Sequence, residues 1–191
     1  MTKHCLLALV LATATSGAAA ETLQYRIDPA HTVVLATWNH VGFSNPSANF
    51  AGASGTIAYD AQAPERSSVE VTIPMSGLDT FVPALDEHLM GADFFDVAQF
   101  PEATFRSTSV RALGEGKLEV TGNLTLHGVT RPVVLAAVLN KAAPHPMGGT
   151  PTIGFDATAT LKRSDFGVDM GVPMVGDEIG LRITTEASAG K

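Results

Sequence analysis

The residues of this chain that could do chemistry are histidines and carboxylates, because its single cysteine, Cys5, lies in an apolar leader. The histidines beyond that leader never occur in the HxH, HxxxH or HExxH spacing that brings two imidazoles to one metal ion. They are His31, His40, His88, His127 and His145. A metal site would need ligands to converge from distant segments, so the sequence predicts no metal ion and no cofactor.

Carboxylates are concentrated in one segment, where two of them could act as acid and base in catalysis. Helix caps and solvated helix faces use the same residue types, and we expect that role here. The group consists of Asp79, Asp86, Glu87, Asp93 and Asp96. Ser54 lies in the sequence GASG, whose second glycine comes one residue too early for a GxSxG nucleophile elbow. The sequence therefore predicts no catalytic residue and a protein that is not an enzyme.

Aromatic residues are concentrated in the same segment, because residues 79–105 hold five of the nine phenylalanines. Leu85 and Leu89 lie four residues apart, Pro83 suits a first helical turn and Gly91 suits a C-terminal stop. The segment therefore predicts one short helical insertion at about residues 82–96. Such a helix in a β protein either closes a packed barrel or lines a cavity, and the residue pattern alone allows both.

The elements that must position these side chains are β-strands, because apolar and polar residues alternate along most of the chain. The alternation is strongest over residues 117–126 and recurs over 68–75, 152–162 and 179–184. Its apolar members should face one interior: Leu118, Val120, Leu124, Leu126, Val71, Ile73, Phe155, Leu181 and Ile183. Weaker patterns bring the number of antiparallel strands to eight or nine.

These strands form one all-β domain, since no linker or repeat divides the chain. They suit a sandwich or a closed barrel, and a barrel leaves no exposed edge. A barrel of about eight strands can be filled by side chains or can hold one small ligand.

The N-terminus has the three-part pattern of a secretory signal peptide. Lys3 precedes an apolar run at residues 6–12, which is too short to span a bilayer, and small residues at 18–20 offer a cleavage site. We expect cleavage after Ala20, a mature domain at residues 21–191 and a periplasmic location.

The net charge and the fraction of charged residues limit the classes of partner that the chain can bind. The net charge is −7, and charged residues make up 16% of the chain against about 25% in typical proteins. An acidic protein binds nucleic acid and anionic surfaces poorly. We therefore expect neither nucleic acid nor a membrane span, while a homodimer stays open.

Short motifs run in order along the mature chain: residues 25–28 (YRID), 39–44 (NHVGFS), 86–89 (DEHL), 92–96 (ADFFD), 100–105 (FPEATF), 122–130 (GNLTLHGVT) and 163–167 (RSDFG). In this series the chain resembles the bacterial YceI-like family of periplasmic polyisoprenoid-binding proteins. The resemblance implies a lipocalin-like barrel whose pore takes a long isoprenoid lipid, of prenyl quinone or prenyl phosphate type, without enzymatic activity. Relatives often carry arginine where this chain has Leu85, so a head-group contact from that arginine is absent here.

An isoprenoid tail can be held without a charged anchor. Burying one CH₂-sized group is worth about 0.8 kcal/mol, so a five-carbon unit gives roughly 3–4 kcal/mol before the costs of ordering the ligand. The side chains expected to line the cavity are Phe43, Phe81, Leu85, Leu89, Phe94, Phe95, Phe155 and Phe166. Two alternatives stay open: an enzyme acting on a small lipid with Asp and His groups at the barrel mouth, and a ligand-free stress-response barrel.

Overall fold

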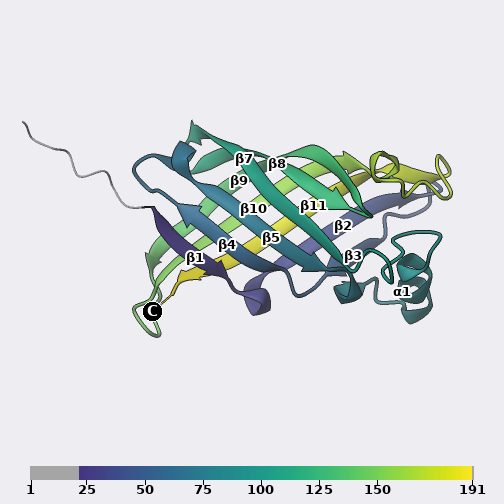
Figure 1. Cartoon of the computed structure of the whole chain (residues 1–191), viewed down its shortest axis with the longest axis horizontal. Helices are drawn as coiled ribbons and strands as arrows, with labels where there is room; N and C mark the ends of the chain where they lie inside the picture. Colours follow the sequence, from purple (N-terminus) through teal and green to yellow (C-terminus); the bar gives the residue numbers. More distant parts are fainter. Residues whose placement is uncertain (1–21, 191) are drawn as a thin grey trace, which may run out of the picture.

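The computed structural model describes residues 22–190, which form a closed antiparallel β-barrel with one helix at one end (Figure 1). The predicted leader and its cleavage site lie outside the described residues. Eight strands run around the barrel in the order β1-β4-β5-β7-β8-β9-β10-β11, and β11 pairs with β1 to close it. Their bounds are β1 (Leu23–Ile27), β4 (Ser54–Tyr59), β5 (Ser68–Pro74), β7 (Glu102–Gly114), β8 (Lys117–Leu126), β9 (Val129–Pro144), β10 (Pro151–Lys162) and β11 (Val175–Ala189). The closure confirms the barrel and excludes the sandwich.

Three further strands extend this barrel at the end that carries the helix. They are β2 (Val33–His40), β3 (Ser47–Phe50) and β6 (Leu78–Asp79). β2 continues β1 along β11 after a 3-10 turn at Pro29–His31, and β6 continues β5 after a second turn at Met75–Gly77. Because β3 pairs with both β2 and β6, the extension forms a wall on one side of the barrel mouth.

The register of the long strands places the alternating apolar residues inside. β8 and β9 pair Leu118 with Ala137 and Val120 with Leu135, and all four side chains face the interior. The nine apolar residues that the alternation assigns to one interior all line its cavities. Lys117, Lys162 and Arg182 are exposed. A slip of one residue would reverse every one of these positions, so the hydrophobic pattern specifies the register.

A tight turn of His127 and Gly128 joins β8 to β9, with φ values of 50° and 72°. Two positive φ values define the hairpin turn whose twist matches the strands. A Cβ at Gly128 would lie 2.6 Å from the ring of Phe100, and that ring packs edge-on against His127 at 4.8 Å between ring centroids. Glycine is therefore required both by the backbone and by the close packing of Phe100.

A buried carboxylate lies at the opposite end of the barrel, just after β4. Asp60 is 1% exposed, accepts hydrogen bonds at 2.9 Å from the N–H groups of Gln62 and Ala63, and pairs with Arg66. Burial alone would raise the pKa of Asp60, but these hydrogen bonds together outweigh it and lower the pKa. The hydrogen bonds and the ion pair of Asp60 in the connection between β4 and β5 thus favour its ionised form.

The helix α1 (Pro83–Met90) lies at the other end and confirms the predicted insertion, although turns replace helix after Gly91. Pro83 occupies the first helical turn, where a missing N–H costs nothing. Asp86 accepts hydrogen bonds from the N–H and the hydroxyl of Thr80 at 2.7 and 2.6 Å, which ties the helix to β6. Residues of α1 are half-buried or exposed. The helix therefore contributes no fully buried side chain to the core.

Candidate functional site

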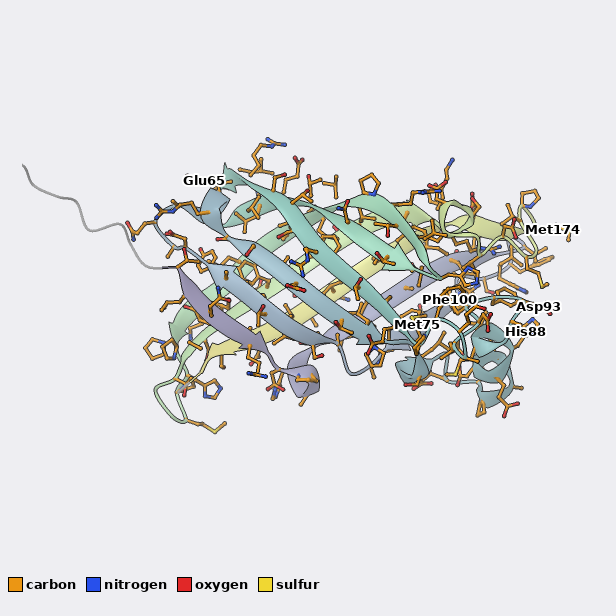
Figure 2. The ribbon with its side chains drawn as sticks, viewed as in Figure 1. Glu65, Met75, His88, Asp93, Phe100 and Met174 are labelled. Carbon is orange, nitrogen blue, oxygen red and sulfur yellow. The ribbon has the colours of Figure 1, made fainter. Side chains whose placement is uncertain are left out.

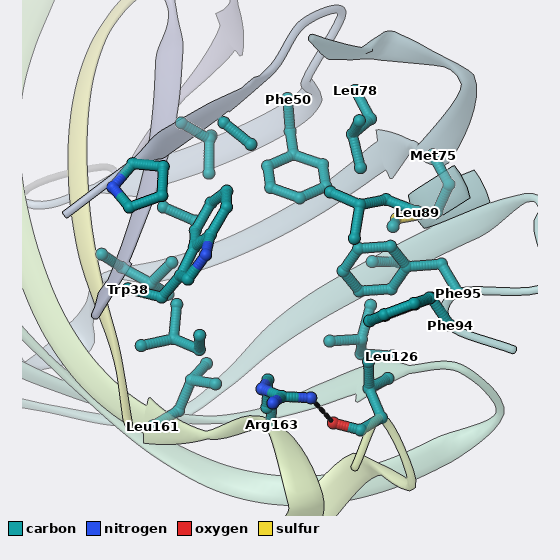
Figure 3. A pocket seen from close by; sticks show the side chains of 18 of the residues that line it. Trp38, Phe50, Met75, Leu78, Leu89, Phe94, Phe95, Leu126, Leu161 and Arg163 are labelled. Atoms are coloured by element: carbon teal, nitrogen blue, oxygen red, sulfur yellow. Dashed lines mark hydrogen bonds between the residues drawn. The ribbon is translucent and has the colours of Figure 1, made fainter. Parts of the chain in front are cut away.

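An apolar cavity of about 430 Å³ lies beneath α1, at the end of the barrel that β2, β3 and β6 extend (Figure 3). Its size falls within the range of ligand pockets in proteins. Its walls consist almost entirely of hydrocarbon side chains, and the polar exceptions are His40, His88 and Arg163. Such a cavity can bind an extended apolar molecule and offers few groups for a charged one.

The helix and the turn after it supply the outer wall. Leu85 and Leu89 face the cavity from α1, while Phe94 and Phe95 face it from the following turn. Phe95 also packs edge-on against Phe50 of β3, with ring centroids 6.0 Å apart. The predicted helical periodicity therefore places its two leucines over open space rather than against a filled core.

A second apolar cavity, of about 160 Å³, continues deeper into the barrel. The two share Val34, Ile73, Leu124 and Leu181 as lining residues, so they are adjacent along the barrel. Phe155 lines the deeper one and packs edge-on against Tyr59 at 5.7 Å. The two cavities therefore follow one another along the apolar interior of the barrel.

The predicted lining residues are thus placed in three kinds of position. Leu85, Leu89, Phe94 and Phe95 line the outer cavity, and Phe155 lines the inner one. Phe166 is 1% exposed and belongs to the packed core. Phe43 and Phe81 are 91% and 74% exposed and lie outside both linings, because each sits on a turn that directs its side chain to solvent. Contact of any of these residues with a ligand stays a prediction.

Several lining residues were not found from the sequence. Trp38 follows Val34 and Ala36 at intervals of two on β2, so period-2 alternation in that strand points to it. It is the only tryptophan of the chain. Phe50 ends β3, Met75 lies in the 3-10 turn directly after β5, and Leu161 is the residue before the last of β10. Trp38 therefore gives the cavity a built-in fluorescent reporter.

Arg163 is the one cationic side chain in the cavity wall, and it is 8% exposed. Its guanidinium donates to the carbonyls of Val168, Met170, Val175 and Gly176 at 2.8–3.0 Å. Burial lowers the pKa of Arg163, while the charges of Asp177 and Asp169 oppose that shift. With four donors directed at backbone oxygens, Arg163 holds the loop between β10 and β11 in shape and presents its stem to the cavity.

Two of the five carboxylates of this segment, Asp79 and Asp86, have structural partners. Asp86 binds Thr80, and Asp79 accepts a hydrogen bond from the N–H of Phe81 at 2.7 Å. His88 packs edge-on against Phe94 at 4.8 Å. Within residues 22–190, no three His, Cys, Asp or Glu side chains are placed to hold a metal ion together. No helix in that range is long and apolar enough to cross a membrane.

An eight-stranded antiparallel barrel with an apolar lumen beneath one helix defines the lipocalin-like class of barrels. The model of the YceI-like domain matches residues 25–187, and the chain belongs to the YceI-like family. A UPF0312 protein of Ectopseudomonas mendocina is 38% identical over 188 residues, which cover 97% of this chain and 98% of the relative.

Solved structures share the fold. BcnA of Burkholderia cenocepacia matches with a TM-score of 0.76 at 25% identity, covering 84% of this chain and 98% of BcnA. A polyisoprenoid binding domain from Saccharophagus degradans matches with a TM-score of 0.68 at 15% identity, covering 88% of this chain and 99% of that domain. The eight-stranded barrel is therefore common to this chain and to proteins of widely divergent sequence.

Proposed function

We propose that this protein binds a long-chain isoprenoid lipid in the lumen of its barrel and acts as a periplasmic carrier rather than as an enzyme. The observation that carries the proposal is the apolar cavity of about 430 Å³ under α1, which leads on to a second cavity deeper in the barrel. A barrel without a ligand would be more stable with this volume filled by side chains, because the walls of an empty cavity lack dispersion contacts. The polyisoprenoid binding of the Saccharophagus domain supports the same ligand class.

The chemistry of the walls favours a ligand whose recognition depends on its tail. Three or four isoprene units would contribute roughly 9–16 kcal/mol before the costs of ordering, which is enough for tight binding. Arg163 donates four N–H groups to backbone carbonyl oxygens, and Leu85 adds apolar surface at the mouth of the cavity. A neutral or weakly polar head group therefore fits better than a diphosphate.

The proposed periplasmic location rests on the residue pattern of the N-terminal leader. We propose that residues 1–20 direct export and that the mature domain begins at Glu21. Intact-mass measurement of periplasmic protein should give a chain that starts at Glu21. A mature form that retains Met1 would contradict this part of the proposal.

Intrinsic fluorescence tests the binding directly, because Trp38 is the only tryptophan and lines the cavity. Titration with prenyl alcohols of increasing length should change the emission of Trp38 saturably, with affinity that rises with each isoprene unit. No saturable change with any chain length would contradict the proposed function.

A further inference from the structure

Exposed apolar side chains gather around the mouth of the outer cavity. The part of the chain that the structure describes has twelve exposed large apolar residues, and six of them lie on three loops at this end. The six are Val41, Phe43, Phe81, Val82, Met170 and Met174. We call these six residues the apolar rim. The three most exposed are Phe43 at 91%, Phe81 at 74% and Met174 at 71%.

The same three loops also build the cavity wall. His40 and Pro46 of the β2–β3 turn, Leu85 just after the second loop, and Val168 and Val175 around the third all line the outer cavity. The N–H of Val41 donates to the carbonyl of Met174 at 3.2 Å, which joins two of the loops. Figure 2 shows Met174 and His88 at one end of the barrel and Glu65 at the other. The apolar rim and the cavity mouth therefore belong to one end of the molecule.

Local hydrogen bonds hold the rim side chains outward. Val41 and Phe81 have φ values of 56° and 65°, which cost energy in residues other than glycine. Asn39 accepts the N–H of Gly42 at 2.8 Å, and the N–H of Phe43 donates to His40 at 3.0 Å, so Phe43 stands on an ordered turn. Apolar side chains at the tips of ordered turns are arranged for contact, since burial in the barrel would not require this backbone.

We propose that the apolar rim inserts into the surface of a lipid bilayer of low net charge, so that a lipid moves between membrane and cavity without crossing water. This inference rests on the proposed function, because an apolar lipid resides in a bilayer when it is not bound. The loop segments that carry the apolar rim, residues 41–46, 80–82 and 167–174, contain no lysine or arginine and one acid, Asp169. Glu87 and Asp93 are exposed beside them. Like charges would oppose an anionic surface, whereas Phe and Met insert at a bilayer interface.

Flotation of the mature protein with phosphatidylcholine vesicles tests the proposal. Wild type should float with the vesicles, and the Phe43→Ser/Phe81→Ser double variant should bind about a hundredfold more weakly, since burying each of the two phenyl groups is worth about one decade in affinity. Adding phosphatidylglycerol to the vesicles should weaken the binding of the wild type. Met147→Ser is the matched control, because Met147 is 90% exposed on the β9–β10 loop at the opposite end, and it should bind as the wild type does.

The readout from Trp38 separates this inference from the proposed function. Phe43 and Phe81 lie outside both cavity linings, so the double variant should bind a soluble prenyl alcohol as the wild type does. Wild-type protein that binds the alcohol but does not float with vesicles, or a double variant that floats equally well, would overturn the rim inference alone. A dimer that the double variant abolishes, without vesicle binding, would assign the apolar rim to a second copy of the chain and would equally overturn it.

Discussion

Replacing Ala36 by phenylalanine should block the cavity while leaving the fold intact. Ala36 lies on β2 between Val34 and Trp38 and lines the outer cavity with both of them. The substitution adds six ring carbons, which would displace a similar number of ligand carbons. At about 0.8 kcal/mol for each CH₂-sized group, the ligand would lose roughly 5 kcal/mol of contacts, part of which it regains by shifting along the lumen. We therefore expect the affinity for a prenyl alcohol to fall about a hundredfold, which corresponds to about 3 kcal/mol.

The stability of the same variant tests whether the space is open. A phenyl group that enters an unfilled apolar cavity gains up to about 1.5–3 kcal/mol of burial, whereas overpacking a filled core costs about 1–3 kcal/mol. Ala36→Phe should therefore unfold in urea at the wild-type midpoint or above it. Leu35→Phe, on the outer face of the same strand, is the matched control and should leave the affinity unchanged. Normal affinity in folded Ala36→Phe, or a loss of stability typical of overpacking, would refute the reasoning.

Three further perturbations address the supporting structure. Arg163→Lys keeps the charge but cannot reach four carbonyls at once, so the free energy of unfolding in urea should fall by roughly 2–4 kcal/mol. An unchanged midpoint would show that the four hydrogen bonds of Arg163 contribute nothing to stability. The pKa of Asp60 is lowered in the folded state, so its contribution to stability is present above the unfolded pKa of about 3.9 and is lost as the pH falls through the folded value. The free energy of unfolding of Asp60→Asn should therefore decline less in acid than that of the wild type. An equal decline in both proteins would assign it to other carboxylates. In Leu85→Arg the new side chain can extend its charge from the cavity wall to solvent, so the melting temperature should barely change. The lipid that co-purifies should shift towards anionic head groups. An unchanged lipid profile in a folded variant would place the head group away from Leu85.

The sequence predicts the regular part of the barrel well because strict alternation has one physical solution. Leu118, Val120 and Leu124 can share one face only if β8 is a strand, and their burial then specifies the register against β7 and β9. The helix could be predicted for the same reason, since Leu85 and Leu89 have helical spacing between a proline and a glycine.

The remaining features depend on backbone conformations that composition does not reveal. Phe43 and Phe81 look like cavity residues by type, but positive φ values at Val41 and Phe81 turn these loops outward. Trp38 lies on β2, whose alternation is weak, and Met75 ends the alternating run 68–75 in the 3-10 turn after β5, so neither was singled out as a cavity residue. Arg163 was missed as a wall residue because its partners are backbone carbonyls, and these have no sequence pattern.

Native mass spectrometry of protein purified from the cells that naturally produce it tests the central claim most directly. The wild type should carry a mass increment that is released on activation as one intact isoprenoid lipid, and Ala36→Phe purified in parallel should carry little or none. An unloaded wild-type protein, or one that carries cleaved or modified products of a lipid, would contradict the account of this barrel as a lipid carrier.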